Sequence, residues 1–137
     1  MKFILMMHSR WSKNGDWDIF NWPASALERH MQFLNALNDD LKKEGVLVGI
    51  EGLSPPNQAR LVKANSEGGP PITDGPFPES KEFLAGWWMI DVESPERAYE
   101  IAGRASVAPG PDGKPLNTPI EVRQVMSGPP PKDRQAP

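Results

Sequence analysis

The apolar residues of this chain change spacing along its length, and the changes mark its main elements. Residues 3–7 are an unbroken apolar run that stops at the polar His8, which predicts a strand buried on both faces at the centre of a sheet. From Pro23 to Gly45 the spacing becomes three or four residues, which predicts a helix about 30 Å long with Pro23 at its first position and Gly45 as its left-handed cap. The expected buried stripe of this helix consists of Leu27, Met31, Leu34, Leu37 and Leu41.

Three further strands and a second helix are expected after Gly45. The strands are predicted over residues 46–50, 81–92 and 120–125, and the last of these alternates apolar and polar residues as a half-buried strand does. Ser94 can cap a helix that begins at Pro95 and ends near Arg104. A small exposed hairpin is expected between the second and third main strands, from residues 59–63 and 71–73.

The order of these elements is strand, helix, strand, strand, helix, strand. It predicts an α+β fold of the ferredoxin-like βαββαβ type with an inserted β-hairpin. In such a fold both helices cover the same face of the sheet. The expected third strand is nevertheless apolar on both faces, because Phe83, Trp87 and Met89 alternate with Leu84, Trp88 and Ile90. A second copy of the chain is the simplest cover for the remaining face, so we expect a homodimer.

The composition narrows the classes of protein and partner. A chain of 137 residues fits one domain with a real core, expected over residues 1–126, followed by a proline-rich, disordered tail over residues 127–137. The net charge is −3 without a basic stripe, so nucleic acid is not an expected partner. The absence of cysteine suits a reducing cytoplasm and excludes thiolate chemistry. The apolar run at residues 1–7 is too short for a signal peptide or a membrane span, so no membrane partner is expected.

Asp74 is the first candidate for a catalytic residue. It belongs to the polar segment Thr73-Asp74-Gly75-Pro76-Phe77, where the Asp-Gly pair favours a turn at the end of a strand. A carboxylate in this position can serve as a general base or a metal ligand, or it can simply cap its own turn.

His8 and Glu51 are the other two candidates for catalysis. His8 ends the first strand and can transfer protons near neutral pH, or it can be only a polar end to that strand. Glu51 ends the second strand, and beside Asp74 it can divide acid and base roles or hold a divalent metal with a histidine. The alternative is that both carboxylates are solvated. His30 is expected at the edge of the helix stripe with one nitrogen in water, and it carries less weight than His8.

The aromatic residues suggest the kind of ligand. The chain has five tryptophans, and rings near a cleft would favour a flat apolar or aromatic molecule. Residues 11–23 are rich in such rings and are expected to pack as an ordered loop. The chain has no glycine-rich phosphate loop, no Gly-x-Ser-x-Gly elbow and no zinc-binding pattern, so nothing points to a hydrolase, kinase or zinc enzyme, and no cofactor is expected.

Several segments together resemble the YCII-related superfamily, and in particular its branch named after the tetrapeptide Asp-Gly-Pro-Phe. The likeness runs from Met1 to about Met126. The segments that carry it are the opening Met1-Lys2-Phe3, residues 45–53, the run from Thr73 to Glu82, Gly86-Trp87-Trp88 and residues 120–125.

This resemblance implies a ferredoxin-like protomer that forms a dimeric α/β barrel, in a family whose members are mostly of unassigned function. Related YCII-like proteins are thought to use a His–Asp pair in a cleft, and one resembles a dehydrochlorinase that acts on a chlorinated hydroxyquinol. Asp74 matches the turn aspartate of the family. His30 is farther from Gly45 than the family pattern places its helix histidine.

Two functions remain open at this point. The first is a cofactor-independent enzyme of the lyase or isomerase type, in which Asp74 with His8 or Glu51 moves a proton on a compact or aromatic molecule. The second is a non-catalytic dimeric protein that binds a small molecule or has an accessory or regulatory role.

Overall fold

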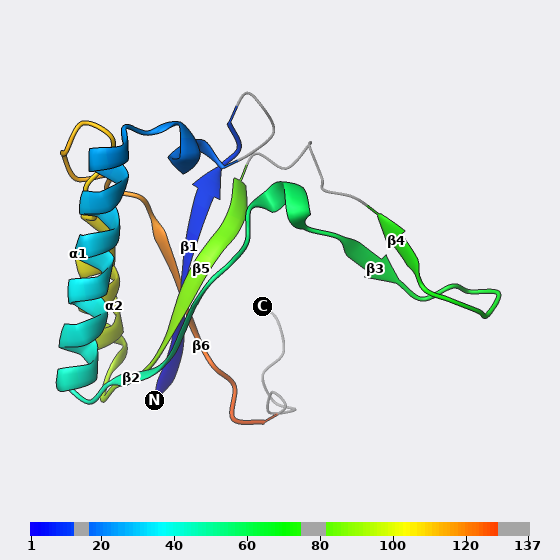
Figure 1. Ribbon diagram of the computed structural model, residues 1–137. Helices are drawn as coiled ribbons and strands as arrows, with labels where there is room; N and C mark the ends of the chain where they lie inside the picture. Colours follow the sequence, from blue (N-terminus) through cyan, green and yellow to red (C-terminus); the bar gives the residue numbers. More distant parts are fainter. Residues whose placement is uncertain (13–16, 75–81, 129–137) are drawn as a thin grey trace, which may run out of the picture.

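The computed structural model describes residues 1–12, 17–74 and 82–128, which form a mixed α+β fold. The main sheet is antiparallel and has the order β2-β5-β1-β6, and it does not close into a barrel within the described part of the chain. Its strands are β1 (Lys2–Arg10), β2 (Leu47–Gly52), β5 (Glu82–Asp91) and β6 (Ile120–Gln124). The helices α1 (Ala24–Lys43) and α2 (Pro95–Ser106) lie together on one face of this sheet (Figure 1).

The apolar run at the start of the chain forms the central strand β1, as its continuous pattern predicts. Leu5 lies opposite Trp88 of β5, and both side chains are buried on the face that the helices cover. The predicted strand and helix boundaries are confirmed to within a few residues. Ser94 caps α2 through a hydrogen bond from the Arg97 backbone N–H to its Oγ, and Gly45 follows α1 with a φ of +75°.

The core lies between the two helices and the sheet. Small side chains on α2 let this helix approach the sheet closely, while α1 and the strands supply the larger residues. The buried residues of this cluster are Phe3, Leu5, Leu37, Leu41, Trp88, Ile90, Val92, Ala98, Ile101, Ala102 and Ala105.

The N-terminal half of α1 buries a different face from the predicted stripe. Met31 was expected inside but its side chain is 46% exposed, whereas Ala26 and His30 are buried. The prediction for His30 was therefore wrong: the residue is 4% exposed instead of lying at the boundary. The physical reason is that α1 here packs against loops as well as the sheet, and these loops offer His30 a hydrogen bond and an aromatic neighbour.

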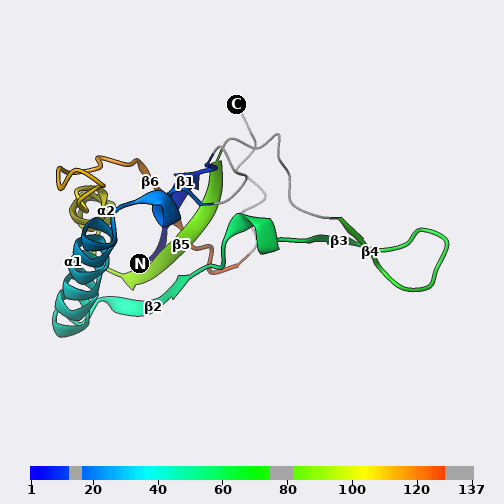
Figure 2. The same cartoon turned by 45° about the horizontal axis from the view of Figure 1, so that its top comes forward.

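The inserted hairpin is confirmed as a separate two-stranded ribbon of β3 (Leu61–Lys63) and β4 (Ile72–Asp74). Figures 1 and 2 show that it projects away from the main sheet. It follows a short 3₁₀ helix, η2 (Pro56–Gln58), and carries exposed apolar side chains at Leu61, Val62 and Ile72. The predicted Asp-Gly turn and most of the predicted disordered tail fall at residues 75–81 and 129–137, outside the described residues.

The other face of the main sheet, which we call the open face, carries apolar side chains that no described helix covers (Figure 1). Side chains that lie directly opposite each other in a sheet share a face. The register places Ile4 opposite Met89 and Met6 opposite Trp87, and all four side chains are half-buried. The prediction that β5 is apolar on both faces is therefore confirmed.

An ionic cluster joins the end of α1 to α2. The Glu44 carboxylate accepts hydrogen bonds from Arg97 at 2.6 Å and from Arg104 at 3.2 Å. The hydrogen bond from Arg97 is the main reason that the pKa of Glu44 lies below its ordinary value, and burial opposes the shift. This contribution to stability is complete above the ordinary pKa and is lost as the pH falls through the lowered one. None of the described helices is long and apolar enough to cross a lipid bilayer.

Candidate functional site

A cavity of about 180 Å³ lies between α1 and the β2–β5 edge of the sheet, and we call it the α1 pocket. Its floor is open because the sheet carries very small residues there. Gly52 of β2 lies opposite Gly86 of β5, on the face that Ile50 and Trp88 share with the core. Ala85, which precedes Gly86 and which the β1–β5 register skips, also lines the pocket. Large side chains fill the equivalent positions elsewhere on this face, so the small residues account for the hollow.

The glycines of the floor differ in the room around them. A Cβ on Gly86 would lie 2.9 Å from the Glu51 carbonyl oxygen, which is backbone and cannot move aside easily. A Cβ on Gly52 would meet no atom within 4 Å. Gly86 therefore allows β2 and β5 to approach each other, and Gly52 leaves space in the pocket itself.

The walls of the α1 pocket are mainly apolar. Leu34 lines it from α1, and Trp17 and Ile19 close one end from the segment around η1 (Asp18–Asn21). Trp17 is held by edge-to-face contacts with Phe20 and Phe83, whose ring centroids lie 5.9 and 5.6 Å away. The predicted packing of the aromatic loop is thus confirmed for its described residues. Such walls exclude water and favour a flat apolar ligand.

His30 is the buried titratable group of this pocket. Its Nδ1 lies 2.9 Å from the carbonyl oxygen of Pro109, in the loop after α2, and its ring packs edge-on against Trp22. A carbonyl oxygen can only accept a hydrogen bond, so Nδ1 carries a proton. In the neutral ring Nε2 then has a free lone pair and can accept a proton from a ligand.

Asn35 and Asn38 of α1 also line the pocket, and Asn38 lies two turns beyond His30. Oδ1 of Asn38 accepts a hydrogen bond of 2.8 Å from Nε1 of Trp88. Both residues line the α1 pocket. Among the described residues the pocket lining includes one acidic residue, Glu51, and no lysine or arginine.

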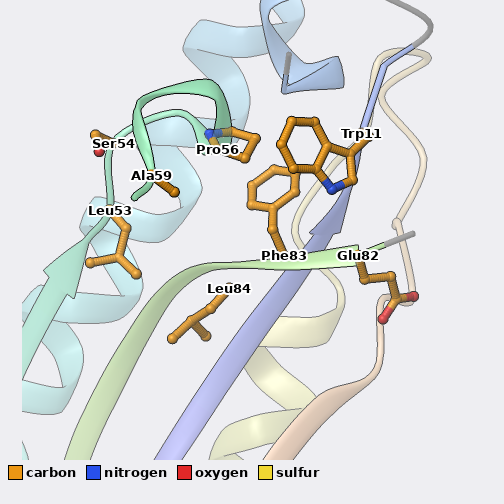
Figure 3. Close-up of a pocket in the computed structure, with 8 residues that line it drawn as sticks. All are labelled: Trp11, Leu53, Ser54, Pro56, Ala59, Glu82, Phe83 and Leu84. Atoms are coloured by element: carbon orange, nitrogen blue, oxygen red, sulfur yellow. The ribbon is translucent and has the colours of Figure 1, made fainter. Parts of the chain in front are cut away.

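A larger cavity of about 410 Å³ lies nearby, and we call it the Trp11 pocket. Figure 3 shows Leu53, Pro56 and Ala59 on one side of it and Trp11 and Phe83 on the other. Nε1 of Trp11 is buried and has no hydrogen-bond partner among the described residues. β5 begins here at Glu82, directly after the undescribed residues 75–81. The α1 pocket, which contains a buried polar residue, is the stronger candidate site.

The structure does not bring His8 and Glu51 together. His8 pairs with Leu84 and Glu51 pairs with Trp87, so one strand separates them and they are offset along it. Their backbones are roughly 10 Å apart across the sheet and about as far along it. Nε2 of His8 instead lies 3.9 Å from the Glu121 carboxylate, while the Glu51 side chain is exposed. His8 does share a small cavity of about 50 Å³ with His30.

Asp74 ends β4, where its backbone pairs with Leu61. The side chain of Asp74 lies outside what the structure describes, so its catalytic role stays a prediction. The alternative that Asp74, Glu51 and a histidine bind a divalent metal also stays a prediction. Among the described residues, no group of three or more potential metal ligands is found.

His30 is a site residue that received too little weight from the sequence, and Asn38 is one that was missed. For His30 a signal existed, because residues 26, 30, 34, 37 and 41 make a stripe as regular as the one that was chosen. For Asn38 no signal existed, because its orientation depends on Trp88, fifty residues away in the chain.

Comparison with known proteins identifies the family. The family model of the YCII-related domain matches residues 1–109, so the chain belongs to the YCII-related family. It is also similar to an uncharacterized protein of Rhizobium meliloti (strain 1021), with 33% identity over 81 residues. This match covers 59% of the chain and 64% of the relative, so the chain spans less than two thirds of that protein's length.

The two floor glycines allow a matched test of the pocket geometry. Gly86→Ala is expected to lower the free energy of unfolding by about 1–3 kcal/mol, because its Cβ would press on backbone. Gly52→Ala has free space around its Cβ and is expected to leave stability within about 0.5 kcal/mol of wild type. Urea denaturation of both variants measures the difference, and an equal loss in the two would contradict the assigned geometry.

Proposed function

We propose that the protein binds a small, flat and largely apolar molecule in the α1 pocket and moves a proton on it without a cofactor, with His30 as the base. The observation that carries this proposal is the hydrogen bond from Nδ1 of His30 to the Pro109 carbonyl oxygen. It leaves Nε2 as the proton-accepting atom of a buried ring that lines a cavity. Reactions of this kind include isomerisation and elimination.

The surroundings of His30 support a catalytic role over a purely structural one. A histidine that serves only to join α1 to a loop has no need of a cavity beside it. Here the cavity is apolar, so a proton transfer inside it would be shielded from water. His8 and His30 both border the smaller cavity, but Nε2 of His8 lies beside Glu121, which pairs with Met6 of the open face, so His8 takes no part in the proposed transfer.

Asp74 remains part of the proposal through the family. The tetrapeptide Asp74-Gly75-Pro76-Phe77 supports membership of the branch named after it. We propose that Asp74 assists as a second acid or base. Glu51 is less suited to this role, because its side chain is exposed on β2.

A second candidate function is binding without catalysis, and one observation favours it. The titratable residues predicted for catalysis are dispersed, with His8 near Glu121 and Glu51 in solvent. A protein that only binds a small molecule needs the apolar pocket and no such cluster.

We also propose that the protomer is the ferredoxin-like half of a dimeric α/β barrel. The half-buried Ile4, Met6, Trp87 and Met89 on the open face support a second copy of the chain as the cover. Two antiparallel sheets packed face to face would bury these side chains and leave the helices outside.

The dimer is tested by sedimentation equilibrium. Wild-type protein is expected to be dimeric, and Met89→Lys is expected to be monomeric because it places a charge in the apolar contact. Tyr99→Lys is the matched control, since Tyr99 is an exposed residue of α2, away from the open face. A monomeric wild type would contradict the proposed dimer. A dimeric Met89→Lys variant would show that the dimer forms through another surface.

The proposed function is tested with a set of small aromatic and unsaturated carbonyl compounds. Compounds that bind should raise the melting temperature of the wild type, and Gly52→Leu, which fills the pocket, should abolish the rise. His30→Asn keeps a nitrogen donor for Pro109 and removes Nε2. It should retain binding but slow exchange of a carbon-bound acidic proton of the ligand for deuterium by about 100-fold to 10,000-fold, measured by NMR.

Two results would contradict the proposal. If no compound of the set binds, or if binding survives Gly52→Leu, the α1 pocket is not the site. If exchange in His30→Asn is as fast as in the wild type, His30 is not the base, and binding without catalysis is favoured.

A further inference from the structure

The polar groups of the α1 pocket also define the ligand that it can hold. We infer that Asn38 is a ligand-binding residue oriented by Trp88, and that the pocket selects a neutral, six-membered ring with a hydrogen-bond acceptor at one end and an ionisable O–H at the other. This inference rests on the proposed function, because it places the O–H at His30.

The first step is the orientation of the Asn38 amide. An indole N–H can only donate, so the atom of Asn38 that faces Trp88 at 2.8 Å is its carbonyl oxygen. The amide nitrogen Nδ2, with its two donors, therefore occupies the other side of the side chain. It has no hydrogen-bond partner among the described residues, although the side chain lines the pocket.

The second step is the rigidity of this arrangement. Trp88 is 4% exposed and lies in the middle of β5, opposite Leu5 of the central strand. Its indole is held by the core, so it fixes the amide in one orientation. A donor that is held in place before a ligand arrives loses little conformational entropy on binding.

The third step is the spacing of the two polar groups. His30 and Asn38 are eight residues apart on α1, which is a rise of about 12 Å. This rise separates the two backbone positions, and a single six-membered ring with substituents at opposite positions and a hydrogen bond of about 2.9 Å at each end has a comparable length. Leu34 and the exposed Asn35 lie between the two groups, and the glycine floor faces them, so the middle of the ligand must be thin.

The fourth step is charge. No lysine or arginine lines the described pocket, and Glu51, which borders it, pairs with Trp87 and has its exposed side chain on the open face. An amide donor without a cation nearby suits a neutral acceptor such as a carbonyl or nitro oxygen better than a carboxylate, whose desolvation would not be compensated. At the other end the ligand O–H bond breaks, the proton joins Nε2 of His30, and the electron pair stays on the ligand oxygen.

The probe that fits these conditions is para-nitrophenol, whose colour reports its ionisation. Wild-type protein is expected to bind it saturably and to hold it as the coloured phenolate. His30→Asn should bind it without the colour change. A carboxylate of similar shape, para-hydroxybenzoate, should bind at least tenfold more weakly.

Two variants separate the role of Asn38 from that of the pocket. Asn38→Asp keeps an oxygen for Trp88 but loses the donor, and it should weaken binding at least tenfold because a carboxylate then faces the nitro group. Trp88→Phe removes the orienting hydrogen bond and should weaken binding about three- to tenfold, the effect of one neutral hydrogen bond. Gln32→Glu, the same kind of charge change on the exposed side of α1, should bind as the wild type does.

The possible outcomes distinguish the inference about Asn38 from the proposed function of the α1 pocket. Wild-type affinity in Asn38→Asp, verified as folded, or equal affinity for para-hydroxybenzoate, would overturn the inference about Asn38. If Gly52→Leu nevertheless abolishes binding, the proposed pocket stands. If the probe does not bind to the wild type while other compounds of the screening set do, the inference fails and the proposed function survives.

Discussion

The hydrogen bond between Nδ1 of His30 and the Pro109 carbonyl oxygen is the interaction on which the functional account depends. It joins α1 to the loop that follows α2, two segments that are seventy-nine residues apart in the chain. An imidazole that is 4% exposed must satisfy its polar atoms or lose stability, so this bond explains why the ring can be buried at all. The same bond selects the tautomer and thereby determines which nitrogen is available for chemistry.

The pocket beside His30 exists because of small residues in the sheet. Gly52 and Gly86 interrupt a face that elsewhere carries Leu5, Ile50, Trp88 and Ile90, and Ala85 lies beside them at an irregularity of β5. The aromatic segment around η1 then closes one end of the hollow, with Trp17 held by Phe83. The cavity is thus a consequence of local sequence in three separate elements that the fold brings together, in a chain that belongs to the YCII-related family.

Most of the secondary structure could be predicted from the sequence, because it depends on local signals. The continuous run in β1, the serine cap of α2 and the positive φ of Gly45 each follow from neighbouring residues. The buried face of α1 could not be chosen on the same grounds. Residues 27 and 31 or residues 26 and 30 can both continue the stripe of residues 34, 37 and 41, and the choice between them depends on Trp22 and Pro109, which contact His30 only in the folded chain.

The candidate site was less predictable than the fold. His8 and Glu51 both lie near the ends of strands, but β5 lies between those two strands. The order of elements along the chain does not by itself give the order of strands in the sheet, so the distance between the two residues could not be predicted. The orientation of Asn38 likewise follows from Trp88, which is distant in sequence. The candidate site therefore depends on contacts between elements, whereas local patterns predict the elements themselves.

The most direct measurement of the central claim is the tautomer of His30 in the wild-type protein. Two-bond correlations between the ring protons and the ring nitrogens distinguish a protonated from an unprotonated nitrogen by NMR. At a pH where the ring is neutral, the account predicts that Nδ1 is protonated and Nε2 is not. A proton found on Nε2, with Nδ1 bare, would break the bond to Pro109 and remove the base from the pocket.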